Sequence, residues 1–208
     1  VSTGNQSIII TEVMPAPLKL ANSKEKPQEW IEIYNQTDQT IDLTNWIIDD
    51  SNGGSKPHRL SQQLIAPHQY ILLNASDTKL NLNNSADQVR LFDADKNLID
   101  AVEYQEAEKN SSYSLITIDG NSEWNWQKTP TPGQANISYI SLTGTVTTAP
   151  QFEQIYHFQI ETSSSTNSPS PTSYLIIFDE ATVKAPLAKN LFTPGTTGKF
   201  IGQLIDQK

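Results

Sequence analysis

Residues 29–35 read Glu-Trp-Ile-Glu-Ile-Tyr-Asn, and their pattern indicates the class of fold. Apolar and polar side chains alternate along it, which is typical of a β-strand that has one face in a core. Ile31 and Ile33 are therefore expected to point into the core, and Glu32 is expected to face water. The pattern predicts a sheet with one buried and one solvated face.

Trp30 and Tyr34 follow the same alternation as Glu32, so they are expected on the outer face of the strand. Amphipathic aromatic side chains anchor protein and glycan surfaces. We therefore interpret Trp30 and Tyr34 as candidate ligand-binding contacts. The alternative is that a neighbouring strand, a loop or a second module covers them.

Short apolar runs of strand length recur on both sides of this stretch, separated by turn-forming residues. Seven such runs predict an all-β sandwich. Trp46, in the third run, is expected to fill the space between the two sheets. The predicted strands are Ile8–Val13, Trp30–Tyr34, Thr40–Ile48, Tyr70–Leu73, Gln88–Phe92, Leu98–Tyr104 and Tyr113–Ile118.

A proline-rich connector, Gln127–Ser138, follows the last of these runs. Its prolines exclude a regular strand, and Gly133 after Pro132 is typical of a turn. Asn136 is interpreted as the cap or turn residue that ties off the domain. We therefore place the boundary at about Asn136, which gives two domains, residues 1–136 and residues 137–208.

Several stretches of the first domain together resemble one known family. They are Glu12-Val13, Glu29-Trp30-Ile31-Glu32-Ile33-Tyr34-Asn35, Ile41-Asp42-Leu43-Thr44-Asn45-Trp46, Asp87-Gln88-Val89-Arg90-Leu91-Phe92, Leu98-Ile99-Asp100 and Thr129-Pro130-Thr131-Pro132-Gly133-Gln134-Ala135-Asn136. In order and spacing, residues 8–136 resemble the lamin tail domain in its bacterial form.

This resemblance implies an immunoglobulin-like β-sandwich without enzymatic activity, as found in nuclear lamins and in bacterial surface or secreted proteins. The chain has no heptad-bearing rod and no basic nuclear-targeting cluster, so the bacterial exported type is the better match. The resemblance brings no catalytic residue, because the matching positions are structural.

The second domain resembles, through fewer residues, an oligonucleotide/oligosaccharide-binding (OB) barrel. Four further strands are expected at Ile140–Val146, Ile155–Glu161, Ser173–Asp179 and Lys199–Ile205. Gly144 permits the bend that a small barrel needs, and a small sandwich is the alternative. Between these strands we expect a loop at Thr162–Thr172 and a short helix within Glu180–Leu191.

Composition excludes several kinds of function. The net charge of −9 repels polyanions, so nucleic acid is a disfavoured partner. The chain has no cysteine, which excludes disulfides, thiolate zinc sites and cysteine nucleophiles. No apolar stretch is long enough for a transmembrane segment, and the polar residues at the start are not a signal peptide. Ser, Thr, Asn and Gln-rich surfaces favour an extracellular or cell-surface location, with any export signal cleaved or outside this sequence.

Two acidic loops invite comparison with calcium sites. Asp93-Ala94-Asp95-Lys96-Asn97 spaces its oxygens as an EF-hand loop does but lacks the glycine and the bidentate glutamate, so a polar hairpin turn is favoured. Asp49-Asp50-Ser51-Asn52-Gly53-Gly54 is likewise interpreted as an exposed loop. The three histidines, His58, His68 and His157, are too scattered for zinc. No cofactor or metal is therefore expected.

These observations favour a non-catalytic chain. The first hypothesis is a scaffold, adhesion or binding module of a bacterial surface or secreted protein, whose partner is a protein or glycan of the cell envelope or matrix. The second is the accessory region of a larger secreted hydrolase. A single-stranded oligonucleotide binder is the third, and the acidic charge disfavours it.

Overall fold

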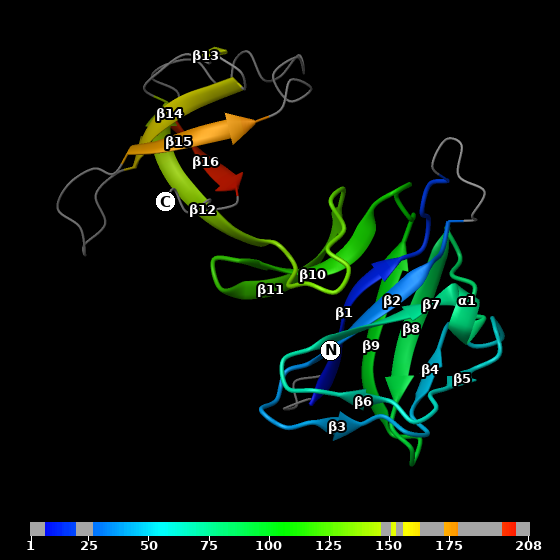
Figure 1. The fold of residues 1–208 in the computed structure, drawn as a ribbon. Coiled ribbons are helices and arrows are strands. Elements are labelled where there is room, and N and C mark those ends of the chain that lie inside the picture. The colour runs from blue at the N-terminus through cyan, green and yellow to red at the C-terminus, as the bar shows by residue number, and fades with distance from the viewer. Residues whose placement is uncertain are drawn as a thin grey trace. The chain divides into compact units, whose positions relative to one another are not determined.

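A computed structural model describes residues 7–19, 27–146, 151–152, 156–162, 173–178 and 197–202 (Figure 1). The chain divides into two compact units, Val1–Ile137 and Ser138–Lys208. Strands dominate both units, and the one helix among the described residues is α1 (Ala75–Thr78). In the described part of the chain, no helix is long and apolar enough to cross a membrane.

The first sheet of unit one has five antiparallel strands in the order β11–β10–β1–β2–β7. Their bounds are β1 (Ile8–Met14), β2 (Trp30–Asn35), β7 (Tyr70–Asn74), β10 (Ser112–Ile118) and β11 (Asn121–Gln127). A bulge lies between Ile10 and Glu12 in β1. Because a bulge shifts the alternation by one residue, Glu12 joins Glu32 on the outer face while Val13 returns to the core.

The second sheet has the order β5–β4–β8–β9 and is also antiparallel. Its strands are β4 (Ile47–Asp49), β5 (His58–Arg59), β8 (Ala86–Phe92) and β9 (Leu98–Gln105). A separate two-stranded ribbon joins β3 (Ile41–Asp42) to β6 (Leu64–Ile65).

One core lies between these sheets and draws buried side chains from both. Ile31 and Ile33 of β2 are buried in it, as the alternation predicts. Val89 and Leu91 of β8 approach from the other sheet. Trp46 is partly buried and packs against the same cluster, which agrees with its predicted place. The predicted all-β, immunoglobulin-like sandwich is therefore confirmed.

The single strand predicted at Thr40–Ile48 is wrong, because a turn divides it into β3 and β4. The Asp42 carboxylate accepts a hydrogen bond from the Thr44 backbone N–H at 2.8 Å, and Trp46 N–H donates to the Leu43 carbonyl at 2.9 Å. Asn45 has a φ of 68°, a left-handed conformation that asparagine tolerates. A local side-chain bond thus replaces the strand ladder.

Three strands of unit one are not anticipated by apolar runs. β5 and β6 have only two residues each, and β11 carries polar residues between its tryptophans. β11 nevertheless pairs with β10 along its whole length, from Asn121↔Ile118 to Gln127↔Ser112. Residues 128–137 contain no strand, as the prolines predict.

The second unit contains β12 (Ser138–Val146), β13 (Gln151–Phe152), β14 (Tyr156–Thr162), β15 (Ser173–Phe178) and β16 (Thr197–Gly202). The described ladders run antiparallel in the order β15–β14–β12–β16, with β13 beside β14. The OB-like barrel stays a prediction. The expected loop at Thr162–Thr172 and helix within Glu180–Leu191 fall almost wholly outside the described residues.

Candidate functional site

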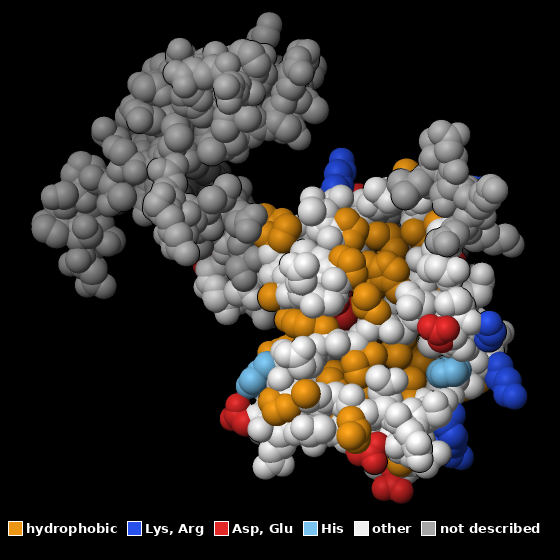
Figure 2. Space-filling view, viewed as in Figure 1, with side chains coloured by type: hydrophobic (Ala, Val, Ile, Leu, Met, Phe, Trp, Pro, Cys, Tyr) orange, Lys and Arg blue, Asp and Glu red, His pale blue; other side chains and the backbone are white. Residues whose placement is uncertain are grey.

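The outer face of the β10–β1–β2–β7 sheet carries both aromatic residues predicted as contacts. In the β2–β7 register, Trp30 lies opposite Asn74, Glu32 opposite Leu72 and Tyr34 opposite Tyr70. Hydrophobic side chains gather on the side of unit one that Figure 2 shows. The face has three parts along β2: an aromatic end at Tyr34, a covered middle at Glu32, and a second end at Trp30.

At the first end, four side chains form what we term the Tyr34 cluster: Tyr34, Asp38, His68 and Tyr70. The rings of Tyr34 and Tyr70 are stacked, with centroids 4.5 Å apart. The Tyr34 hydroxyl lies 3.1 Å from His68 Nδ1, and His68 Nε2 lies 2.8 Å from Asp38 Oδ1. A neutral imidazole protonated at Nε2 would donate to Asp38 and accept from Tyr34, so both contacts can be satisfied together.

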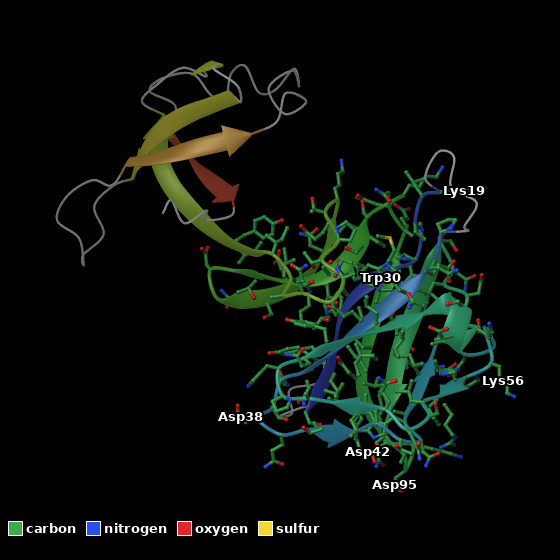
Figure 3. The ribbon with its side chains drawn as sticks, viewed as in Figure 1. Lys19, Trp30, Asp38, Asp42, Lys56 and Asp95 are labelled. Carbon is green, nitrogen blue, oxygen red and sulfur yellow. The ribbon has the colours of Figure 1, made fainter. Side chains whose placement is uncertain are left out.

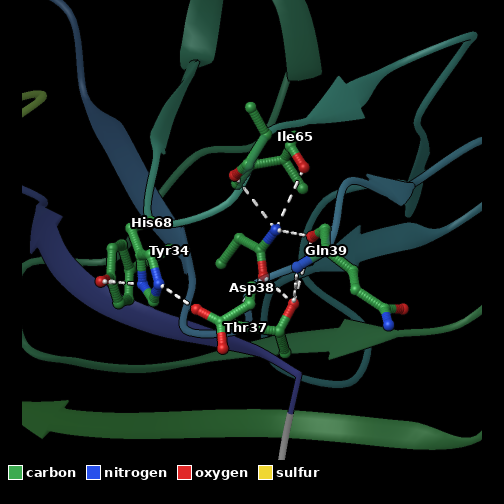
Figure 4. A network of polar contacts seen from close by, with 8 residues as sticks. Tyr34, Thr37, Asp38, Gln39, Ile65 and His68 are labelled. Carbon is green, nitrogen blue, oxygen red and sulfur yellow. Dashed lines mark hydrogen bonds and ion pairs between the residues drawn. The ribbon is translucent and has the colours of Figure 1, made fainter.

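A buried amide holds the two loops that supply this cluster. Asn35 is fully buried, and its Nδ2 donates to the carbonyl oxygens of Gln39, Ile65 and Ala66 at 2.7, 3.1 and 3.0 Å (Figure 4). Its Oδ1 accepts from the Thr37 backbone N–H at 3.0 Å. The loop after β2 and the loop before β7 are therefore fixed to each other, which brings Asp38 to His68.

The cluster suits binding better than catalysis. Its carboxylate–imidazole–hydroxyl order has the connectivity of a catalytic triad. However, the Asp38 side chain is 97% exposed and that of His68 is 53% exposed. Water screens such groups, whereas activation of a nucleophile relies on a desolvated site. What remains is an aromatic pair beside an exposed acceptor and an exposed imidazole, a combination that can contact a polar ligand.

Trp30 does not join Tyr34 in one site. It lies at the start of β2, opposite Met14 of β1 and Asn74 of β7, and its side chain is half-buried. Figure 3 shows Trp30 and Asp38 well apart on unit one. The two predicted contacts are therefore at opposite ends of one strand, with Glu32 between them.

Glu32, in the middle of the face, is fully buried. The prediction that it faces water is therefore wrong. Residues 131–136, which follow β11, cover Glu32. Gly133 N–H donates to Glu32 Oε2 at 2.6 Å, and the Thr11 hydroxyl donates to Oε1 at 2.7 Å. Glu32 has the alternation of a solvent-facing residue, and a segment about one hundred positions later supplies its cover.

Glu12 is also fully buried, directly across the ladder from Glu32. Its Oε1 accepts from the hydroxyls of Ser112 and Ser114, and its Oε2 accepts from the Thr131 hydroxyl at 3.0 Å. Asn136 completes the arrangement by donating to the Thr11 carbonyl at 2.7 Å and the Leu115 carbonyl at 3.0 Å. We call Glu12, Glu32, Thr131, Gly133 and Asn136 the carboxylate clasp.

Burial is the main cause of an altered acidity in the clasp. It raises the pKa of Glu32 to about 7, and the negative charge of Glu12 adds to that increase. Hydrogen bonds from Thr11 and Gly133 oppose it, because they stabilise the carboxylate. The predicted roles of the closing segment agree with this geometry: Gly133 has a φ of +76°, and Asn136 ties the segment to β1.

The two acidic loops are held by protein groups. Asp93 accepts from the backbone N–H groups of Asp95 and Asn97 at 2.9 and 2.8 Å, which makes the hairpin turn between β8 and β9. In the other loop, Asp49 pairs with Arg90 at 2.7 Å and Asp50 accepts from Ser55 N–H. Among the described residues, no group of three or more His, Asp or Glu side chains could hold a metal ion.

Sequence reasoning misses Asp38, His68 and Asn35 as members of a site. Asp38 and His68 are thirty positions apart in loops of ordinary turn composition, so periodicity gives them no signal. Asn35 ends a strand, where a polar residue is unremarkable. The pairing of β2 with β7 and the hydrogen bonds of the Asn35 amide bring these residues together.

The comparisons with known proteins identify the family. The sequence model described as Lamin Tail Domain matches residues 2–106, which span β1 to β9. No curated protein and no solved structure matches the chain significantly. The matching family is a non-catalytic, immunoglobulin-like domain family, which agrees with the observed sandwich and with the exposed, solvated groups of the Tyr34 cluster. The chain belongs to the lamin tail domain family.

Proposed function

We propose that this chain is a non-catalytic binding module of a bacterial surface or secreted protein, and that the Tyr34 cluster binds a carbohydrate of the cell envelope or matrix. The observation that carries the proposal is the stacked Tyr34–Tyr70 pair beside an exposed carboxylate and imidazole. Aromatic rings pack against the apolar faces of sugars, while carboxylate and imidazole groups hydrogen-bond to sugar hydroxyls.

Preorganisation of the site supports this proposal. Loops that must be ordered on binding lose affinity through their conformational entropy. The buried Asn35 amide already fixes both loops of the cluster, so Asp38 and His68 are held in place before any ligand arrives. The absence of cysteine and the acidic charge are compatible with an exported protein that does not bind nucleic acid.

A glycan array probed with the full chain, followed by titration calorimetry on each hit, tests the proposal. Asp38→Asn and Tyr34→Phe remove a charge and a hydroxyl with little change of shape. Each is expected to weaken binding about tenfold, roughly the effect of one lost hydrogen bond to a charged or polar partner.

Trp30→Ala is the matched control, because Trp30 is an aromatic residue on the same strand and face but outside the cluster. It should leave binding within about twofold of the unaltered chain, an energetic change well under 1 kcal/mol. If all three variants fold and bind a glycan as tightly as the unaltered chain, the Tyr34 cluster is not the binding site. Capture of an envelope protein in place of any glycan would contradict the assignment to carbohydrate.

A further inference from the structure

The carboxylate clasp fastens the last segment of unit one to the first two strands. Thr131 and Gly133 each donate a backbone N–H to a buried carboxylate, the first to Glu12 at 3.1 Å and the second to Glu32 at 2.6 Å. These two carboxylates and Asn136 hold residues 131–136, which immediately precede the second unit at Ser138.

In the closed clasp, one hydroxyl group faces two acceptor oxygens. The Thr131 hydroxyl has a single hydrogen but lies 3.0 Å from Glu12 Oε2 and 2.8 Å from Asn136 Oδ1. Asn136 uses its Nδ2 as the donor to Thr11 and Leu115, so its Oδ1 is an acceptor. The hydroxyl hydrogen of Thr131 cannot serve Glu12 Oε2 and Asn136 Oδ1 together, so one more proton on the pair of carboxylates can complete the hydrogen bonds of the closed clasp.

The charges around the clasp favour that proton. Glu12 and Glu32 are cross-strand neighbours, and two like charges this close disfavour double ionisation. Burial raises the pKa of Tyr70 of β7, and the negative charge of Glu32 contributes to that increase. β10 contributes the hydroxyls of Ser112 and Ser114, and residues 131–136 contribute amides and a hydroxyl. None of the described lysines, arginines or histidines forms an ion pair with either glutamate.

We infer that the clasp is a proton-dependent latch: it is closed while the Glu12–Glu32 pair holds one proton, and loss of that proton releases residues 131–136. Protonation is coupled to closure, because residues 131–136 cover both carboxylates when the clasp is closed. Once the segment lifts, water reaches them and the second negative charge no longer lies in a desolvated site. The latch does not require a ligand at the Tyr34 cluster.

The direction of the response follows from linkage. The pKa of Glu32 is about 7 in the closed clasp, against 4.5 for an exposed glutamate. The closed form therefore binds more protons than the open form between these values, so closure is complete at low pH and weakens as pH rises through 7. Release would free six residues, about 20 Å of extended chain, in the connection to the second unit.

Amide hydrogen exchange of the full 208-residue chain, measured by NMR between pH 6 and pH 8, tests the latch. After correction for intrinsic exchange, protection of the Gly133 amide should fall about tenfold over this range, because the closed form holds on average about half a proton more than the open form across these two pH units. The amide of Leu60, which donates to the Trp46 carbonyl at 2.8 Å away from the clasp, is the internal control and should show no such change.

Glu32→Gln is the decisive variant, because its amide oxygen can still accept from Gly133 N–H while the negative charge opposite Glu12 is removed. Its Gly133 protection should be independent of pH. Every other residue is the same in the two chains, so a difference between them reports on Glu32. Constant Gly133 protection in the unaltered chain, or a tenfold change that persists in the variant, would overturn the inference.

Thr131→Val provides a second test that does not alter the glutamates. It removes the hydroxyl contact to Glu12 and Asn136, so Gly133 protection should fall at least tenfold at pH 6. Protection equal to that of the unaltered chain would show that the clasp does not hold the segment, and would contradict the latch even if Glu32→Gln failed to fold.

Discussion

The side chain of Asn136 donates a hydrogen bond to the backbone carbonyl of Thr11 at 2.7 Å, across 125 positions of sequence. The carbonyl lies at the bulge of β1, where the regular ladder with β2 is interrupted. An acceptor that the ladder leaves free is thus satisfied by the residue that ends the first unit. The start and the end of the domain therefore depend on each other.

The first prediction concerns where the domain ends. A fragment of residues 1–137 should fold cooperatively, whereas one of residues 1–106, the span of the family match, should not. The shorter fragment lacks β10, which pairs with β1, and exposes the buried Glu12 and Glu32. Far-UV circular dichroism and urea unfolding of both fragments check this. A sigmoidal urea transition in the shorter fragment would contradict it.

The second prediction concerns Asn35. Asn35→Ala removes the donor to three carbonyl groups, of which that of Ile65 belongs to a buried residue. The cost to the free energy of unfolding should be about 3 kcal/mol, measured by urea denaturation. Asn81→Ala, at an exposed position, should cost less than about 0.5 kcal/mol. Equal stability of the two variants would show that the amide does not hold the loops.

The third prediction concerns Arg90 of β8. Its guanidinium pairs with Asp49 at 2.7 Å and donates to the Asp50 carbonyl, and both charged side chains are only about one-eighth exposed, 13% and 12%. Arg90→Met leaves the Asp49 carboxylate nearly buried without a cation, which should destabilise the domain by about 3 kcal/mol.

Burial already raises the pKa of Asp49, more than the nearby Arg90 charge lowers it. The double variant Arg90→Met with Asp49→Asn should therefore recover part of that loss, because it removes the unpaired charge. Urea unfolding of the two single variants and the double variant measures the coupling. Strictly additive losses would show that the pair contributes no interaction energy.

The fourth prediction is the pH dependence of global stability. The folded-state pKa of Glu32 is about 7 and its ordinary value is 4.5, so the folded state binds the extra proton. Stability from this group is full below the ordinary value and falls as pH rises through 7. Between pH 6 and pH 8 the folded state holds on average about half a proton more than the unfolded state. The loss over these two pH units should therefore be about 1.4 kcal/mol.

Urea unfolding at both pH values should show that loss in the unaltered chain and a smaller one in Glu32→Gln. The difference between the two chains is the quantity to compare, since every other titrating group is common to them. A difference that does not change between pH 6 and pH 8 would contradict the raised pKa of Glu32.

The sequence predicts the elements that bury a hydrophobic face. β2 follows from its alternation, and the order of the family-like stretches predicts the sandwich. The turn that divides β3 from β4 is missed, because the Asp42 side chain forms it against a strongly apolar local pattern. β11 is missed since its strand character comes from tryptophans that pack on Tyr113, not from a continuous apolar run.

The sites depend on contacts that local pattern does not contain. Tyr34 is predicted as an outward aromatic residue, but its partners His68 and Tyr70 come from the β6–β7 loop and the strand beside it. The alternation along β2 predicts that Glu32 faces water, whereas residues 131–136 cover its side chain. Whether Tyr34 or Trp30 binds a ligand stays a prediction.

The position of β1 has a consequence for synthesis of the protein. β1 is synthesised before its neighbour β10, which is complete only at Ile118, and before Asn136, whose side chain bonds to it. Until β10 is made, the edge of β1 that faces β10 therefore has no partner, in a strand that begins with three consecutive isoleucines. Such long-range pairing slows folding and leaves a sticky edge for chaperones or other nascent chains to meet.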